Sequence, residues 1–326
     1  MKAQLVHELG GIEALRYQEV DDPETPAGHV KIGVRAAALN FPDLLIIQGL
    51  YQIRPELPFA PGAEASGVVI EVGAGVGSVG VGDRVIGFAA NGAMAEQFVV
   101  PHGNVFRIPD ALTFEKAAGI AMIYGTSYHA LFDRARLMKG ETLLVTGATG
   151  GVGSAAVQLG KAARADVIAA VGSQAKVETA ERLGADHVIV YGEESLKDRT
   201  KEITGGAGVD VVYDPVGGDV FLETLRCVGW GGRVLVVGFA SGTIPNAPMN
   251  LPLLKGSSIV GVFWGDFARR NPKANASNFE RIFQMAVDGT IDPMVSATFP
   301  IDRAPEALRT LANRTAVGKV VLTFDR

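Results

Sequence analysis

Cysteine is almost absent from this sequence of 326 residues, in which Cys227 stands alone. A single thiol forms no disulfide within the chain, and it excludes a zinc site built from several cysteines. Histidine is also scarce, and no two histidines have the helical spacing of a metalloprotease; they stand at positions 7, 29, 102, 129 and 187. We therefore expect a protein of a reducing compartment that binds no metal.

An excess of positive charge is missing as well. The formal net charge is −5, and Lys and Arg are scattered along the chain, which argues against nucleic acid or a lipid surface as a partner. No apolar run approaches the roughly 18 residues that cross a membrane. The first 20 residues lack the apolar core of a signal peptide. We expect a cytoplasmic globular protein, and the length indicates about two domains.

The rhythm of the sequence changes near residue 122. Up to 121, short apolar segments alternate with Gly, Pro and Asp turns, which predicts a β-rich domain. From 122 onward strands alternate with helices, and the strands are apolar on both faces, as in a doubly wound parallel sheet. The predicted strands are 142–146, 166–171, 187–191, 209–214, 233–238 and 258–263. The last 60 residues, with helices at 277–288 and 304–313 and a strand at 318–324, are expected to return to the first domain.

A glycine-rich stretch, TGATGGVG, separates the strand ending at Thr146 from the helix beginning near Gly151. The unpaired N–H groups and positive dipole of a helix N-terminus favour an anion, and glycines let a pyrophosphate approach the backbone. The strict dinucleotide pattern has three glycines, and Ala148 replaces the first of them, followed by Gly150, Gly151, Val152 and Gly153. A nucleoside-triphosphate loop is disfavoured because Ser154 and Ala155 follow instead of Lys and Ser or Thr.

The end of the second strand indicates which dinucleotide binds. An NAD site usually has Asp or Glu there, about 20 residues after the glycines, to hold the ribose hydroxyl groups. This sequence has Gly172, Ser173 and Lys176 instead, with Tyr191 at the end of the third strand. A small donor and a cation suit a 2′-phosphate, so we expect NADPH. The other interpretation of Lys176 is a solvated helix residue.

The run GETLLVTGATGGVGSAAVQLGK, from Gly140 to Lys161, resembles the signature of the zinc-independent quinone oxidoreductases. These are the zeta-crystallin-like branch of the medium-chain dehydrogenase/reductases. The segments 40–51, 61–76 and 80–87 resemble the same family, so the likeness covers nearly the whole chain. It implies an α/β fold in which a Rossmann doubly wound parallel sheet, residues 122–265, is inserted in a GroES-like β-rich catalytic domain, residues 1–121 plus 266–326. It also implies an active cleft at the junction of the two domains and a homodimer formed through the edge strand at 258–263.

The resemblance also bears on metal binding. Zinc-dependent relatives have Cys where this chain has Asn40 and His where it has Ala63, before Glu64. Both zinc ligands are therefore replaced here, which favours a metal-free reduction. The sequence departs from the quinone reductases at Leu45, where they often have Tyr, and at Ala63, where they often have Thr.

The resemblance further implies three candidate catalytic residues, each with a structural alternative. Asn40 would lie near the nicotinamide or the acceptor oxygen, or form an Asx turn before Pro42. Tyr51 would hydrogen-bond cofactor or acceptor, or pack as an aromatic with a solvated hydroxyl. Asp43 would order this loop, or cap the helix expected at 44–48.

Further cofactor contacts are implied around the nicotinamide and the phosphates. Thr126 corresponds to a family contact on the nicotinamide side, and Phe239 with the backbone of Phe263 and Trp264 would cover the ring. The alternative for 263–264 is a hydrophobic edge. Arg314 corresponds to a position that reaches the cofactor phosphates, or is a surface arginine.

The first functional hypothesis is therefore a metal-free, NADPH-dependent quinone reductase. The second keeps the fold and cofactor but reduces the carbon–carbon double bond of enals, enones or enoyl thioesters. A third, of a different class, is a non-enzymatic NADPH-binding protein. A zinc alcohol dehydrogenase is disfavoured by the missing ligands.

Overall fold

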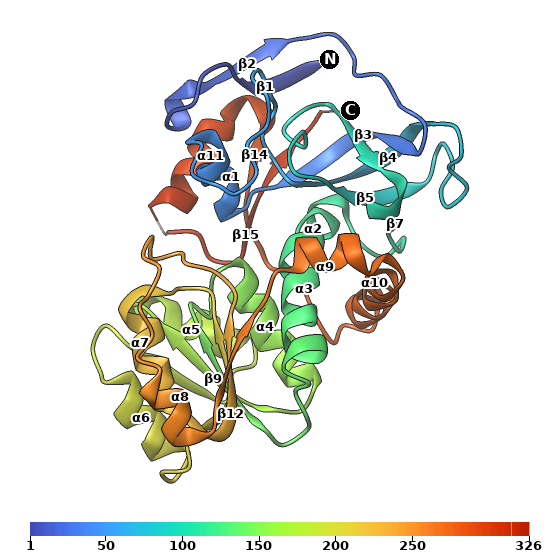
Figure 1. Ribbon diagram of the computed structural model, residues 1–326. Coiled ribbons are helices and arrows are strands. Elements are labelled where there is room, and N and C mark those ends of the chain that lie inside the picture. Colours follow the sequence, from blue (N-terminus) through green and yellow to red (C-terminus); the bar gives the residue numbers. More distant parts are fainter. Residues whose placement is uncertain (314, 326) are drawn as a thin grey trace. The chain divides into compact units, whose positions relative to one another are not determined.

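The computed structural model describes residues 1–313 and 315–325, and the chain divides into two compact units. Unit 1 comprises residues 1–122, 279–287 and those from 293 onward, and unit 2 comprises 123–278 and 288–292. Figure 1 shows the β-rich unit 1 and the α/β unit 2 coloured along the chain. The predicted fold class, a Rossmann sheet inserted in a GroES-like β-rich domain, is confirmed.

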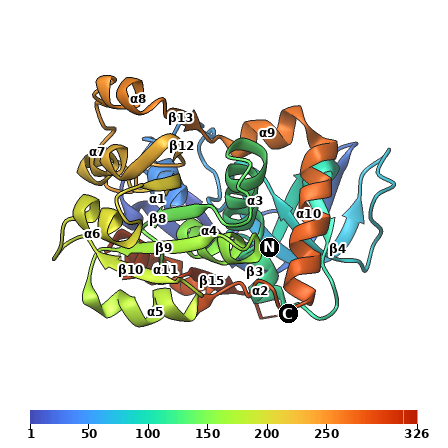
Figure 2. The same ribbon diagram turned by 90° about the horizontal axis from the view of Figure 1, so that it is seen from below.

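Unit 2 contains a six-stranded parallel sheet in the order β10-β9-β8-β11-β12-β13. Numbered from β8, this is the dinucleotide-binding order 3-2-1-4-5-6, and Figure 2 shows it across the sheet. The strands are β8 (Thr142–Thr146), β9 (Asp166–Val171), β10 (His187–Val190), β11 (Val209–Asp214), β12 (Val228–Val236) and β13 (Ser258–Gly261). The helices that lie wholly or partly in unit 2 are α3 (Ala121–Tyr128), α4 (Gly151–Ala162), α5 (Val177–Arg182), α6 (Leu196–Ile203), α7 (Gly218–Cys227), α8 (Asn250–Lys255), α9 (Trp264–Arg270) and α10 (Pro272–Val287).

Helices cover this sheet, and the strands are accordingly apolar. Helices α4 and α5 pack on β8, β9 and β10, whereas α7 packs on β11 and β12. The core between α7 and the sheet contains Leu144, Ile168 and Val212 of the strands and Phe221 of α7, all of them buried. Burial on both faces is the reason that these strands read as continuous Val and Ile runs. The order of the strands reverses between β8 and β11, where open sheets of this kind bind ligands.

Unit 1 is built on the strands β14-β15-β3-β4-β5-β7, with β6 paired to β3 and a separate β1-β2 hairpin. The strands are β1 (Lys2–Val6), β2 (Leu15–Glu19), β3 (His29–Ala38), β4 (Glu64–Val72), β5 (Arg84–Phe88), β6 (Gln97–Pro101), β7 (Val105–Arg107), β14 (Val295–Pro300) and β15 (Lys319–Thr323). The helices are α1 (Phe41–Ile47), α2 (Phe114–Ala118) and α11 (Ala304–Ala312).

The strand register brings three distant segments together. Strand β15 is antiparallel to β3, with Val321 opposite Ala38. Continuing this register by two residues places Lys319 opposite Asn40, just past the end of β3. On the other side of β3, Glu64 of β4 is also opposite Ala38. The ends of β3, β4 and β15 therefore meet at one place in unit 1.

The chain rejoins unit 1 at Phe279, whereas the sequence predicted a return at 266. Packing within each unit explains the difference. The Trp264 indole donates to Asn275 Oδ1 at 3.0 Å, and Asn278 donates to Asp133 at 2.9 Å, so α9 and the start of α10 belong with unit 2. Phe279 stacks on Phe106 of unit 1, with 4.3 Å between the ring centroids.

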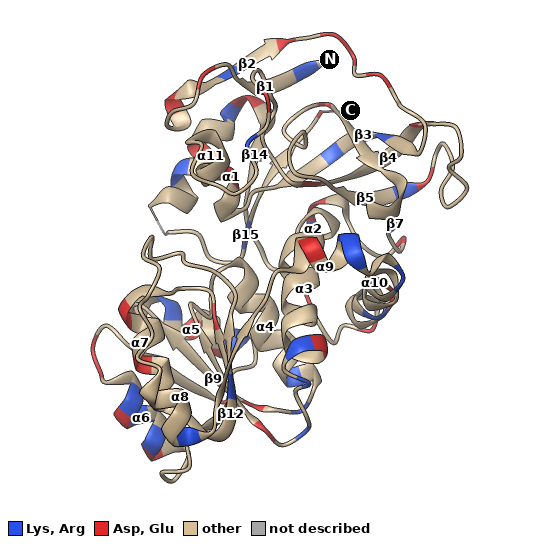
Figure 3. Cartoon of the chain, in the orientation of Figure 1, with Lys and Arg blue, Asp and Glu red and all other residues tan. Residues whose placement is uncertain are grey.

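Charges of both signs are interspersed over the two units, as Figure 3 shows. Among the described residues, no helix combines the length and the apolar character needed to cross a bilayer.

Candidate functional site

The loop between β8 and α4 requires glycine at two positions. Gly147 has φ +56°, a conformation that side chains disfavour. A Cβ on Gly153 would lie 2.2 Å from the Gly147 carbonyl oxygen, so the helix could not approach the strand. Because Gly147 supplies the left-handed residue, Ala148 can occupy the first position of the dinucleotide pattern, fully buried. Gly147 thus provides the left-handed conformation in this turn, and Ala148 can replace the first glycine of the pattern.

The first turn of α4 is open to an anion. Its N-cap is Gly150, which provides no side-chain cap, and Gly150, Gly151 and Val152 are half-buried. Side chains of α3 and β11 hold this turn in place. The Ser127 hydroxyl donates to Val152 O at 2.9 Å and forms a hydrogen bond with the Tyr213 hydroxyl at 2.8 Å. Sequence reasoning missed Ser127, which comes directly after the predicted contact Thr126.

The residues predicted to hold a 2′-phosphate lie at the ends of β9 and β10. A Cβ on Gly172 would lie 3.1 Å from the Tyr191 hydroxyl oxygen, so the Tyr191 ring lies over Gly172. Ser173 is exposed, and Lys176 ends the short helical turn that Ser173 begins. The segment after β9 has no carboxylate before Glu178, so this donor set fits a phosphate monoester.

A buried carboxyl group stands at the end of β11, beside the point where the strand order reverses. Asp214 is 1% exposed, and it accepts from the Thr146 hydroxyl and from Gly217 N at 2.9 Å. Burial raises the pKa of this carboxyl. The contact joins the ends of β8 and β11 and shapes the loop, and Asp214 was not among the predicted residues, although an acid at the end of an apolar strand was a usable signal.

The residues predicted to cover the nicotinamide differ in accessibility. Phe263 is 61% exposed and Phe239 36%, and the Phe239 ring lies over Gly217. Trp264 is buried, its ring against Gly125, so only its backbone is available to a ligand. Thr126 is half-buried on α3. Arg314 lies outside the described residues.

Two of the candidate catalytic residues, Asn40 and Asp43, lie at the start of α1, and Tyr51 follows its end. This helix begins at Phe41 with Asn40 as its N-cap and a proline in its first turn. The prediction that Asp43 caps a helix at 44–48 is therefore wrong, because Asp43 is the third residue of the helix. Its carboxylate reaches back and accepts from Asn40 N at 2.7 Å, which fixes the start of the helix.

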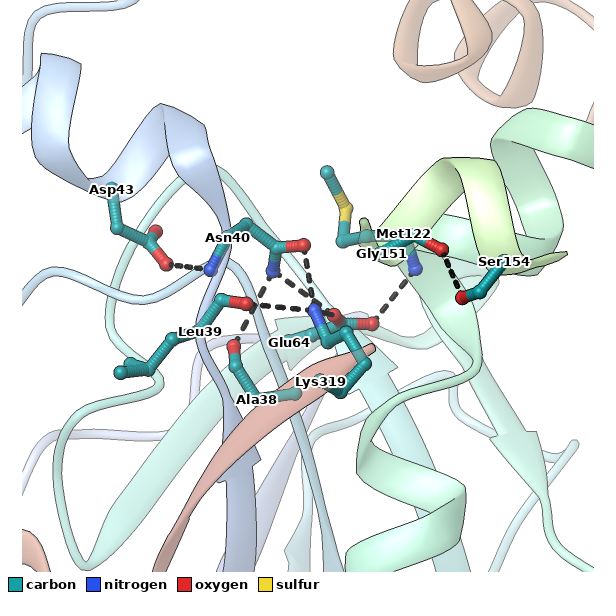
Figure 4. Close-up of polar contacts among 9 residues, drawn as sticks. All are labelled: Ala38, Leu39, Asn40, Asp43, Glu64, Met122, Gly151, Ser154 and Lys319. Atoms are coloured by element: carbon teal, nitrogen blue, oxygen red, sulfur yellow. Dashed lines mark hydrogen bonds and ion pairs between the residues drawn. The ribbon is translucent and has the colours of Figure 1, made fainter. Parts of the chain in front are cut away.

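A lysine ammonium is buried beside Asn40 (Figure 4). Lys319 Nζ donates to Leu39 O at 2.8 Å, Asn40 Oδ1 at 2.8 Å and Glu64 Oε1 at 2.9 Å. Its side chain is 2% exposed and that of Glu64 is 0% exposed. Asn40 Nδ2 donates to the same Glu64 oxygen at 2.9 Å, and Glu64 Oε2 accepts from Met122 N at 2.7 Å. Sequence reasoning missed Lys319, and it used Glu64 only to locate Ala63.

Asp43 is a buried acid next to this cluster. It is 0% exposed, and its Oδ1 has no hydrogen-bond partner. Burial raises the pKa of Asp43 to about 7, the Asn40 N–H and the Lys319 charge oppose the rise, and the Glu64 charge adds to it. Tyr51 packs half-buried against the core of unit 1, and burial together with the Asp43 charge raises the pKa of its hydroxyl.

The residues present do not fit a catalytic zinc ion. Within the described ranges, 1–313 and 315–325, no three His, Cys, Asp or Glu side chains gather as metal ligands. Ala63 is buried and apolar, and Glu64 is paired with an ammonium that would repel a divalent cation.

The chain is similar in sequence and in structure to known dehydrogenases and quinone oxidoreductases. Residues 26–110 match the family described as alcohol dehydrogenase GroES-like domain, and residues 151–280 match the family described as zinc-binding dehydrogenase. Quinone oxidoreductase-like protein 2 of Mus musculus is 39% identical over 96% of this chain and 89% of its own length. The synaptic vesicle membrane protein VAT-1 homolog of Homo sapiens is 32% identical over 96% of this chain and 84% of its own. The crystal structure of Escherichia coli quinone oxidoreductase complexed with NADPH has a TM-score of 0.92 and 31% identity, covering 99% of this chain and 100% of that one.

Proposed function

The chain belongs to the zinc-independent, quinone oxidoreductase-like family of the medium-chain dehydrogenase/reductases, and from this premise we propose that it reduces quinones with NADPH without a metal ion. The observation that carries the metal-free part of the proposal is the buried ion pair of Lys319 with Glu64. A metal-dependent enzyme would have its metal ion and the ligands of that ion at this site, where this chain has an ammonium. The NADPH bound by the similar Escherichia coli enzyme supports the choice of cofactor.

Residues of unit 2 would hold the cofactor. The first turn of α4, with Gly150, Gly151 and Val152, would bind the pyrophosphate next to Ala148. Ser173, Lys176 and Tyr191, with Gly172, would take the 2′-phosphate. Thr126, Phe239, Phe263 and the Trp264 backbone would contact the nicotinamide side, and Arg314 the phosphates. When bound, NADPH supplies the hydride that an acceptor needs.

Residues of unit 1 would bind and polarise the acceptor. Both Nδ2 protons of Asn40 are donated to Ala38 O and Glu64 Oε1, so Asn40 would not donate to a quinone oxygen. Its Oδ1, which accepts from Lys319, could accept a second hydrogen bond from an N–H group such as that of the nicotinamide carboxamide. The Tyr51 hydroxyl can donate one, and the raised pKa keeps it protonated. Asp43 is fully buried, so it would act by holding the Asn40 backbone N–H and not by contact with the acceptor.

The acceptor is tested by measuring NADPH oxidation with a panel of quinones and a matched panel of enals, enones and enoyl thioesters. The proposal predicts the higher kcat/KM for quinones. Higher values for the second panel would make the chain a double-bond reductase with the same cofactor. Tight NADPH binding without turnover in either panel would favour the non-enzymatic alternative.

The coenzyme preference is expected to depend on Lys176. Substitution of Lys176 by Ala removes a cation from the 2′-phosphate site, and should weaken NADPH binding by roughly 10- to 100-fold while NADH binding changes little. Competitive titration of both coenzymes measures the ratio. Lys161→Ala is the matched control, because that lysine of α4 is paired with Asp186 at 2.6 Å and should leave the ratio unchanged. Equal affinity of the unmodified protein for both coenzymes would contradict the assignment.

We also propose a homodimer formed through the 258–263 segment. Strand β13 is at the end of its sheet, so no strand of the described part of the chain pairs with its outer side. Nearby exposed apolar residues, Leu253 and Leu254 of α8, are 81% and 69% exposed and would be covered by a partner.

Sedimentation velocity tests the dimer. The unmodified protein should sediment with twice the mass of one chain, and Val260→Lys should shift it towards the monomer, because a lysine on an edge strand opposes strand pairing. Val81→Lys, at an exposed site in unit 1, is the control that should stay dimeric. A single-chain mass for the unmodified protein would refute the dimer.

A further inference from the structure

The charge balance of the unit 1 site is provided by the chain itself. An ammonium has three N–H donors, and all three of Lys319 are used, by one backbone carbonyl, one amide oxygen and one carboxylate. The side chain is almost inaccessible to water, so this set of oxygens replaces its hydration shell. Three oxygen acceptors from three different residues therefore surround one buried cation.

The contacts go further than neutralising Glu64. The Asn40 amide is held at both ends, since its oxygen accepts from Lys319 and its nitrogen donates to Glu64 Oε1 and to Ala38 O. The cation and the anion therefore determine which end of the amide is the acceptor. If the ammonium were removed, the amide oxygen would lose the partner that fixes its orientation.

Asp43 is coupled to the same cation. It touches Asn40 through the backbone N–H, and the Lys319 and Glu64 charges act on it with opposite signs. The site thus contains the Lys319–Glu64 ion pair and, on the other side of Asn40, a buried acid.

We propose that Lys319 is the resident cation of this site and a positioning residue for the reaction, holding the Asn40 amide and the Glu64 carboxylate as a bound metal ion would. The inference rests on the proposed function for its catalytic part. In this site a lysine takes the place of a metal ion beside Glu64.

The first test asks whether turnover needs the charge of the Lys319 ammonium or only a side chain of that length. Lys319→Met keeps the length of the side chain and removes the ammonium, and a double variant, E64Q with K319M, removes both charges and so avoids an unpaired buried ion. Both should lower kcat for acceptor reduction by about 100-fold, because Asn40 is no longer held. The Kd for NADPH should be unchanged. Lys31→Met is the matched control: Lys31, also in unit 1, pairs with Glu71 at 2.6 Å and should leave kcat unaltered.

Chemical rescue tests whether a free cation suffices. Lys319→Ala leaves a space lined by Leu39 O, Asn40 Oδ1 and Glu64 Oε1. Propylammonium in the medium should restore part of kcat, whereas 1-propanol at the same concentration should not. Rescue by both compounds, or near-unmodified kcat in the double variant, would overturn the proposal in favour of a space-filling role.

A second readout does not need turnover. In protein labelled at asparagine, the Asn40 side-chain amide protons should exchange slowly, because Asn40 is 9% exposed and both protons are donated. Exchange should be at least about tenfold faster in the E64Q/K319M double variant than in Glu64→Gln alone, so that the difference reports the loss of Lys319. Equal exchange would show that Lys319 does not hold the amide. Absence of turnover in the unmodified protein would refute the proposed function and would leave this result to decide the positioning role.

Discussion

Removing the Glu64 carboxylate should be among the most destabilising single changes in unit 1. Glu64→Ala leaves the Lys319 ammonium buried without its counter-charge, and it also leaves Met122 N and Asn40 Nδ2 without an acceptor. Breaking a buried ion pair by removing one partner costs about 3–5 kcal/mol. Native-state hydrogen exchange of β3 and β4 amides in denaturant reports the free energy of opening of the strands that carry this pair.

Glu71→Ala is the control for this effect. Glu71 is 52% exposed and pairs with Lys31, so its removal should cost less than about 1 kcal/mol. In E64Q/K319M the loss should largely disappear, since no unpaired charge remains. A cost for Glu64→Ala no larger than for Glu71→Ala would mean that the Glu64–Lys319 pair is open to water.

The sequence was sufficient for the features that depend on local pattern. The Val- and Ile-rich strands and the glycine loop predicted the sheet of unit 2, and the strand ends placed Tyr191, after β10, beside Gly172, after β9. These inferences succeed because strands of a parallel sheet end at one edge, so residues just past each strand are brought together by topology alone.

The cluster of Lys319 with Leu39, Asn40 and Glu64 could not be predicted in this way. Its members are separated by up to 280 positions and meet only through the register of β15 on β3 and of β4 on β3. A lysine at the start of an apolar strand is usually interpreted as a solvated residue, because lysine is rarely buried unless paired. The capping role of Asn40 was missed for a related reason: the helix was expected to start three residues later, and helix boundaries depend on contacts that propensity does not reveal.

Asp43 should make the stability of unit 1 depend on pH in an unusual direction. Its pKa is about 7 in the folded protein and 3.8 for an ordinary aspartate. A raised pKa means that the folded state binds the proton more tightly, so this contribution to stability is complete below pH 3.8 and is lost as the pH rises through 7. Three pKa units correspond to roughly 4 kcal/mol.

Asp43→Asn isolates this contribution, because an amide oxygen can still accept from Asn40 N but does not ionise. The variant should gain stability relative to the unmodified protein between pH 4 and pH 8, by a few kcal/mol, with a constant difference outside that window. Unfolding free energies of both proteins across this range measure the gain. Asp83→Asn supplies a control of opposite sign: hydrogen bonds from Gly80 N and Arg107 lower the pKa of Asp83, so its contribution is present above its unfolded pKa and is lost on acidification. A pH-independent difference between Asp43→Asn and the unmodified protein would mean that Asp43 stays ionised when buried, stabilised by Lys319 against the charge of Glu64.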